Sequence, residues 1–141
     1  MRSRKIKVGF KLEDAGLVHM PYSIEKTQWI LIVANFTDKI FDVLNPEYGV
    51  DKYLKAISSI IHYFRAIFLI CYPNAKFNVR DFGQRIIDVP KQNFSYDSGV
   101  FVLRYIQTHN GSRVQSFSNF DINSFAREVF LQDYGVQLKA K

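Results

Sequence analysis

The stretch that decides the fold is VPKQNFSYDSGVFVLRY, residues 89–105. Pro90 ends a short apolar strand, since proline cannot donate to a sheet ladder. A polar loop follows, and the apolar spacing after it predicts a helix over residues 98–107. Either Asp97 or Ser98 is expected to cap this helix by accepting hydrogen bonds from its first N–H groups. The pattern therefore places polar side chains at the N-terminus of an apolar helix.

This stretch resembles the nucleophile segment of the Ulp/SENP-type SUMO-specific cysteine proteases. In that family a glutamine precedes the nucleophile by six residues, and the nucleophile lies in Tyr-Asp-Cys-Gly before an apolar helix. Here Gln92 lies six residues before Ser98, which is flanked by Tyr96, Asp97 and Gly99. The resemblance implies an α+β, papain-like fold of the Ulp protease type, with a central mixed sheet flanked by helices.

A second match lies upstream. Residues 29–36, WILIVANF, are apolar at nearly every position, as in a central strand, and residues 37–39 form a turn before the strand 40–44. This hairpin resembles the one that carries the histidine and aspartate of the family's catalytic triad. The step Met20-Pro21 also matches an apolar-proline step that often precedes that strand. The resemblance covers about residues 17–134.

Compared residue by residue, the family's triad is lost. The nucleophile position holds Ser98, the histidine position holds Gln28, and the aspartate position holds Asn45 on a gap-free comparison of the hairpin. Only Gln92, at the position of the oxyanion glutamine, is retained. A serine hydroxyl needs a general base, and an amide cannot accept its proton. Since triad members act as a unit, the substitutions predict a chain without peptidase activity.

Three residues leave alternatives open. Asp42 replaces Asn45 as the aspartate counterpart if the hairpin is shortened, although a solvent-facing position on the strand is the simpler expectation. His19 supplies the base only if the strand register shifts. Trp29, which follows the histidine position, is a ligand-groove residue in the family, and a tryptophan beside a buried strand is equally often a core residue.

The remaining elements follow from periodicity. Alternation predicts strands over residues 5–12 and 17–20, the second ended by Pro21, and a strand over residues 86–89. Apolar residues at three-to-four spacing predict a helix over residues 51–70. The last helix is expected to begin at Asp121 as its N-cap and to stop at Gly135. We divide the chain into a basic arm or strand, residues 1–16, and a Ulp protease-like domain, residues 17–141.

Composition narrows the class of protein. Five of the 19 basic residues lie within the first 11 positions, which leaves 14 basic against 13 acidic residues and a nearly neutral body. A nucleic-acid surface carries its charge on the folded face, so a solvated arm is favoured and nucleic-acid binding is not. No secretory signal or membrane-spanning run is evident, and Cys71 is the single cysteine. We expect an intracellular protein, nuclear or cytoplasmic, without cofactor or metal. A mitochondrial presequence is the weaker alternative, because the arm alternates like a strand.

Two functional readings remain. The first is an inactive protease-like domain that binds a protein, a ubiquitin-like protein or another. The second is an active deSUMOylating peptidase whose serine is native or engineered, although engineering would not explain Gln28 or Asn45. Only 27 residues precede Gln28, whereas the family's domains carry a longer N-terminal portion. We therefore expect exposed apolar surface that is covered by a partner or by a second copy.

Overall fold

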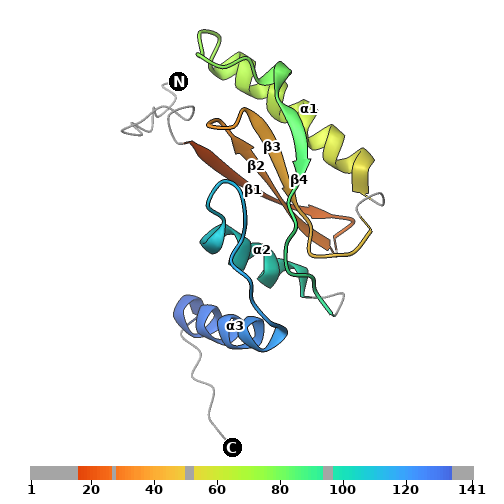
Figure 1. The fold of residues 1–141 in the computed structure, drawn as a ribbon, viewed down its shortest axis with the longest axis vertical. Coiled ribbons are helices and arrows are strands. Elements are labelled where there is room, and N and C mark those ends of the chain that lie inside the picture. The colour runs from red at the N-terminus through yellow and green to blue at the C-terminus, as the bar shows by residue number, and fades with distance from the viewer. Residues whose placement is uncertain (1–15, 27, 50–52, 94–96, 135–141) are drawn as a thin grey trace, which may run out of the picture.

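The computed structural model describes residues 16–26, 28–49, 53–93 and 97–134. These residues form a four-stranded mixed sheet with helices on both faces (Figure 1). The elements in chain order are β1 (Leu17–Ile24), β2 (Gln28–Asn35), β3 (Ile40–Leu44), α1 (Leu54–Cys71), the 3₁₀ turn η3 (Val79–Asp81), β4 (Gly83–Ile86), α2 (Ser98–Thr108) and α3 (Asn119–Tyr134). The predicted strand over residues 5–12 lies outside the described residues.

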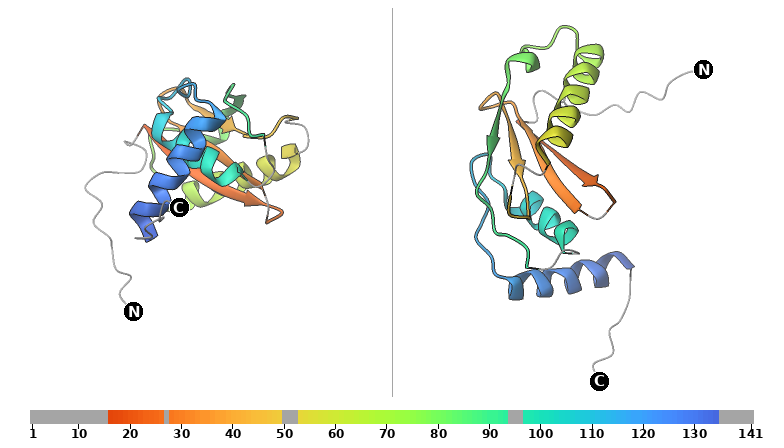
Figure 2. Two further views of the ribbon diagram at one scale, coloured as in Figure 1. Left: turned by 90° about the horizontal axis from the view of Figure 1, so that it is seen from below. Right: turned by 90° about the vertical axis from the view of Figure 1, so that its right-hand side faces the viewer.

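The strand order is β1-β2-β3-β4, with β1/β2 and β2/β3 antiparallel and β3/β4 parallel. The predicted central strand is confirmed as β2, which lies between β1 and β3 and is buried on both faces. Helix α1 covers one face of the sheet, and α2 covers the other with α3 outside it (Figure 2). The α+β class and the mixed sheet are as expected.

The alternation of side chains along β2 divides the core in two. Ile30, Ile32 and Ala34 point toward α1 and join an aromatic cluster that includes Phe36 and Phe41. Leu31 and Val33 point toward α2 and pack with Phe101 and Tyr105. Because successive strand residues face opposite sides, one apolar strand supplies both cores. Strand β2 is therefore packed on both faces, and it begins at the candidate site.

Two predicted strands have different bounds in the structure. Strand β1 does not end at Pro21 but runs to Ile24, with Pro21 opposite Leu31. A proline is tolerated there because β1 is an edge strand of the sheet. Strand β4 was predicted over residues 86–89 but lies at Gly83–Ile86, because its pairing with β3 decides where it begins.

The helix ends also differ from the expectation. Helix α3 begins at Asn119, so Asp121 lies in its first turn rather than at the N-cap. The Asp121 carboxylate accepts hydrogen bonds from the N–H and hydroxyl of Ser118, and the Ser118 hydroxyl accepts from the Asp121 N–H. This reciprocal arrangement is a capping box, in which Ser118 is the cap. The expected stop at Gly135 lies outside the described residues.

Candidate functional site

The family's site positions meet at one end of the sheet. Gln28 is the first residue of β2, and Asn45 follows the last residue of β3. Since the two strands are antiparallel neighbours, the start of one lies beside the end of the other. Ser98 reaches the same place from the N-terminus of α2, and Gln92 from the loop before it. Residues up to 70 positions apart in sequence are thus gathered around the start of β2.

Ser98 is a structural link in this arrangement. Its side-chain oxygen accepts a hydrogen bond of 2.8 Å from the backbone N–H of Trp29, and the residue is only 1% exposed. Ser98 is the first residue of α2, and Asp97 at the N-cap makes no side-chain capping bond. Asp97 is therefore the N-cap residue, as one of the two expectations had it, but the expected side-chain capping bond is absent among the described residues. Ser98 instead links the start of α2 to the start of the central strand β2.

Gln28 and Gln92 are paired through their amides. The Gln28 Nε2 donates to Gln92 Oε1 at 3.2 Å, and Gln28 is 5% exposed. The backbone N–H of Gln92 donates to the Pro46 carbonyl at 2.8 Å, which fixes the loop against the end of β3. A side-chain amide offers donors and acceptors but no group that takes up a proton at neutral pH. The two amides thus fix the loop at Gln92 to the start of β2, and neither of them can act as an acid or a base.

Asn45 is turned toward its own loop. Its side-chain oxygen accepts from the Glu47 N–H at 3.0 Å, and its backbone carbonyl accepts from Lys91 Nζ at 2.7 Å. Burial lowers the pKa of Lys91, an effect that the nearby Asp88 carboxylate opposes. The Asn45 Nδ2 is buried and has no hydrogen-bond partner in the part of the chain that the structure describes. Among the described residues, no hydrogen bond joins the Asn45 side chain to Gln28.

Trp29 lines a cavity beside Ser98. The residue is 40% exposed, so it is not a plain core residue. The cavity has a volume of about 730 Å³ and is bordered mainly by apolar atoms of Pro21, Lys26, Trp29, Ser98, Gly99, Val100, Val102 and Leu103. Gly99 leaves room for the indole, since a Cβ atom there would lie 3.4 Å from Trp29 Cδ1. The cavity offers an apolar, partly open surface directly next to the nucleophile position.

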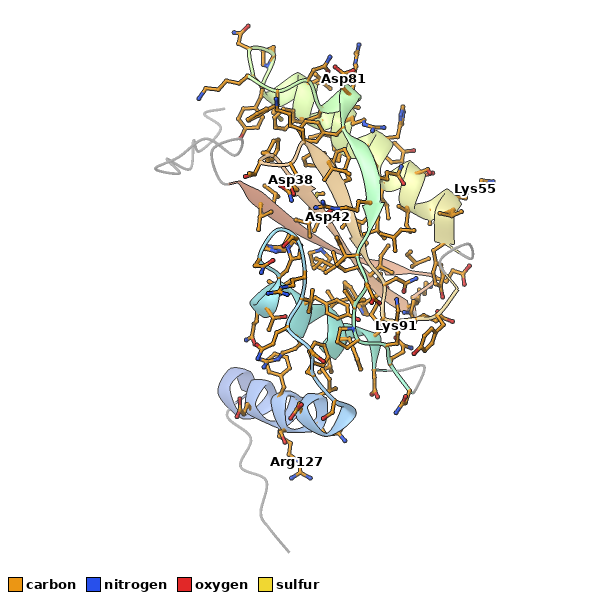
Figure 3. All side chains as sticks on the ribbon, viewed as in Figure 1. Asp38, Asp42, Lys55, Asp81, Lys91 and Arg127 are labelled. Carbon is orange, nitrogen blue, oxygen red and sulfur yellow. The ribbon has the colours of Figure 1, made fainter. Side chains whose placement is uncertain are left out.

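Asp42 is neither solvent-facing nor part of this site. It is completely buried, and both of its oxygens accept from Arg85, at 2.8 Å from Nε and 3.2 Å from Nη2. Asn35 donates to it at 3.2 Å, and the ring of His109 lies 3.8 Å away. Figure 3 labels Asp42 and Asp38 toward one end of the sheet and Lys91 toward the other. The expectation of an exposed Asp42 is wrong, because the buried carboxylate is paired with a guanidinium.

His19 also lies away from Ser98. It pairs with Val33 in the β1/β2 register, whereas Ile24 pairs with Gln28. Five residues of strand separate the two positions, which is about 16 Å. The ring of His19 contacts that of His109 at 5.6 Å between centroids. His19 therefore belongs to the Asp42 end of the sheet and lies too far from Ser98 to act on it.

Sequence reasoning missed several residues at both ends. Lys26 and Gly99 border the cavity, and Lys91 holds the Asn45 carbonyl. Arg85 and His109 surround Asp42. The sequence could have indicated only Gly99 and Lys91, because they are the direct neighbours of Ser98 and Gln92. Lys26, Arg85 and His109 reach these places only through contacts between segments far apart in the sequence. Within the described ranges, no cluster of histidine, cysteine and carboxylate side chains could hold a metal ion.

Comparisons with known proteins identify the family and the fold of the chain. The model of the Ulp1 protease family, C-terminal catalytic domain, matches residues 3–139. The fold resembles the C-terminal Ulp1 protease domain in complex with SMT3, the yeast ortholog of SUMO, with a TM-score of 0.71 and 15% identity. It also resembles the SUMO protease Ulp1 with its catalytic cysteine oxidised to a sulfenic acid, with a TM-score of 0.69 and 14% identity.

In both comparisons the alignment covers 89% of this chain and 57% of the other. The chain thus spans little more than half the length of the solved structures that it matches. A de-sumoylating protease gives a TM-score of 0.51 at 17% identity, with 86% and 53% covered. No curated protein matches the chain by sequence.

Proposed function

This chain belongs to the Ulp1 protease family, and we propose that it is a member that does not cleave peptide bonds and instead binds a protein. The observation that carries the proposal is the state of Ser98. Its hydroxyl oxygen is buried and accepts the Trp29 N–H, while the neighbouring position that should supply a base holds Gln28. The position of the family's nucleophile thus holds a hydroxyl group that joins α2 to β2.

The chemistry argues against catalysis at each position. A cysteine at a helix N-terminus reacts as a thiolate, which the helix dipole and an imidazolium stabilise. A serine at neutral pH has no useful anionic fraction and depends on a base that takes its proton. Gln28 cannot take that proton, and its amide is engaged with Gln92. Because triad members act together, loss of nucleophile, base and orienting carboxylate removes the mechanism.

The binding half of the proposal rests on Trp29 and its cavity. An exposed tryptophan beside an apolar hollow is a typical anchor point for a protein ligand. A solved relative of the same fold is held in a complex with the yeast ortholog of SUMO. We therefore expect the partner of this chain to be a ubiquitin-like protein, received at the cavity next to Ser98.

The catalytic half is tested with fusions of SUMO and ubiquitin to a reporter. We expect no cleavage above that of the Ser98→Ala variant, which has no hydroxyl at that position. Thiol-directed ubiquitin-like probes should not label residue 98. Cleavage that disappears in Ser98→Ala would contradict the proposal and would favour the second reading, an active peptidase with a serine nucleophile.

The binding half is tested by titrating the chain with SUMO and other ubiquitin-like proteins in a calorimeter. We expect Trp29→Ala to weaken binding about tenfold or more, as for a buried aromatic anchor. Tyr48→Ala is the matched control, because Tyr48 is 77% exposed and does not border the cavity. Equal affinity of the two variants, or no binding of any ubiquitin-like protein, would refute this assignment of the partner.

A further inference from the structure

A line of side chains crosses the sheet at its Asp42 end. His19 pairs with Val33 in the register of β1 and β2, and Val33 pairs with Asp42 on its other side. Asp42 in turn pairs with Arg85 of β4. Because residues directly opposite one another share a face of a sheet, these side chains lie in one line from β1 to β4. Val33 packs toward α2, and His109, the residue that follows α2, lies against this line.

His109 is buried among these side chains. Its side chain is 0% exposed, its Nε2 lies 3.8 Å from Asp42 Oδ2, and its ring meets that of His19 edge-on. We call His19, Asp42, Arg85 and His109 the cross-sheet cluster. Neither ring nitrogen of His109, nor Nε2 of His19, has a hydrogen-bond partner in the part of the chain that the structure describes. A neutral imidazole has one N–H donor, whereas a protonated one has two and a full charge. The cluster therefore accommodates its two rings better neutral than protonated.

The carboxylate nearest to His109 is already engaged. Asp42 Oδ1 accepts from Arg85 Nε at 2.8 Å, and Oδ2 accepts from Arg85 Nη2 and from Asn35 Nδ2 of β2 at 3.2 Å each. The distance of 3.8 Å between His109 and Asp42 is longer than a hydrogen bond. A protonated His109 would have to displace one of these donors or remain a buried charge without a hydrogen bond.

The charged and titratable groups around His109 come from β1, β3 and β4. Burial lowers the pKa of His109; Asp42 opposes this shift, whereas His19 and Arg85 add to it. Burial lowers the pKa of His19 as well. Asp38, in the turn after β2, contacts Arg85 at 3.2 Å and is 44% exposed, so its charge is directed to the guanidinium. The closed cluster thus disfavours protonation of both histidines.

The side chains that bind Asp42 also hold the loop between α2 and α3 (Figure 1). The Gly111 carbonyl accepts from Asn35 Nδ2 at 2.8 Å and from Arg85 Nη2 at 3.1 Å. Gly111 has a φ of +101°, which favours glycine, and a Cβ atom there would lie 3.8 Å from Leu17 Cδ2. The loop therefore lies directly on the edge strand β1, two residues after the buried His109 ring.

From this geometry we propose that the cross-sheet cluster is a pH-sensitive switch, in which protonation of His109 and His19 releases residues 109–113 from the sheet while the sheet stays folded. In the closed form both rings are buried and neutral. In the open form His109 reaches water, where its charged form is solvated, so protons bind the open form better. The loop is therefore closed above pH 6.5, and opening becomes more favourable as the pH falls below it. The proposal concerns the end of the sheet remote from Ser98 and does not rest on the proposed function.

The switch is tested by amide hydrogen exchange of the full chain, followed by NMR at pH 7.5 and pH 5.5. The reporters are the amides of His109 and Asn110, which donate to the carbonyls of Tyr105 and Arg113. Their protection factors are taken relative to an unstructured chain at the same pH, which removes the direct effect of pH on exchange. A histidine that is neutral when closed and titrates normally when open raises the opening equilibrium by up to about tenfold over this range. We expect protection to fall by about tenfold to a hundredfold.

Variants assign this loss of protection to the two rings. The double variant His19→Gln, His109→Gln should keep the protection of the loop unchanged between the two pH values. His62→Gln is the matched control, because His62 is exposed on α1, and it should show the full loss. A second measurement needs no variant: the pKa of His109, read from its imidazole NMR signals, should lie below 6.5.

Low concentrations of urea separate local opening from global unfolding. Local opening exposes little surface, so the protection of the loop should not change with urea, whereas that of the β2 amides should fall. Any of three results would overturn the proposal. These are loop protection that is equal at both pH values, a loss that the double variant shows in full, and loop protection that falls with urea in parallel with β2. A pKa of His109 at or above 6.5 in the folded chain would overturn it as well.

Discussion

The two ends of the sheet carry polar clusters of opposite character. At the Ser98 end, Gln28, Gln92 and Asn45 interact through neutral amides and backbone groups. At the other end, the Asp42 carboxylate is completely buried and is paired with the Arg85 guanidinium. Neutral amides need only hydrogen bonds, whereas a buried charge needs a specific counter-charge. The Ser98 end is thus held by neutral hydrogen bonds, whereas a buried ion pair joins β3 to β4 at the Asp42 end.

The largest effect is expected at the Asp42 end. Asp42→Ala should lower the free energy of unfolding by about 3–5 kcal/mol, because Arg85 and Asn35 both lose their buried acceptor. Asp38→Ala is the control, since Asp38 also accepts from Arg85 but is 44% exposed. It should cost about 0–1 kcal/mol. Urea unfolding measures both, and equal losses would show that burial of the carboxylate does not matter.

The next effect is a dependence of stability on pH. Burial lowers the pKa of His109 and of His19 below 6.5; the Asp42 carboxylate opposes the shift at His109, while His19 and Arg85 add to it. The unfolded chain therefore binds more protons in acid, so the stabilisation is complete above pH 6.5 and is lost as the pH falls below it. We expect a slope of at most about 1.4 kcal/mol per pH unit for each histidine.

This pH dependence is checked by urea unfolding between pH 7.5 and 5.5. His109→Gln and His19→Gln should each flatten the profile. His62→Gln should leave it unchanged, because His62 is exposed on α1. A profile that none of the three variants alters would assign the titration to other groups.

Sequence alone was informative where the signal is local. The apolar run that became β2 and the helix after Ser98 were placed within a residue or two, because each is determined by neighbouring side chains. The family resemblance brought Ser98 and Gln28 together, although they are 70 positions apart. Burial of Asp42 was not visible, since Arg85 and His109 lie 43 and 67 residues away. A pattern of one strand could not reveal a counter-charge supplied by another.

A moderate effect is expected for Ser98→Ala at the candidate site. The variant removes the acceptor of the Trp29 N–H, so a partly buried backbone donor loses its partner. The cost should be about 1–2 kcal/mol, less than for Asp42→Ala because no charge is left unpaired. Ser58→Ala, at an exposed position of α1, is the control and should change stability by less than about 0.5 kcal/mol. If thermal melts showed a larger loss of stability for Ser98→Ala than for Asp42→Ala, the Ser98 end would be the one that contributes more to stability.

The smallest effect on stability, but a specific one, is expected for Gly99→Ala. The added Cβ would lie 3.4 Å from Trp29 Cδ1, at the edge of ordinary contact, and Gly99 does not have a positive φ. The free energy of unfolding should therefore change by less than about 0.5 kcal/mol. Trp29 is the single tryptophan, so its fluorescence reports on the cavity directly. Gly83→Ala, where the added Cβ meets no atom within 4 Å, should leave the emission unchanged. If both variants shifted the emission equally, or neither did, Trp29 would not lie against the start of α2. The cavity next to Ser98 would then lack the aromatic anchor on which the proposed binding of a protein rests.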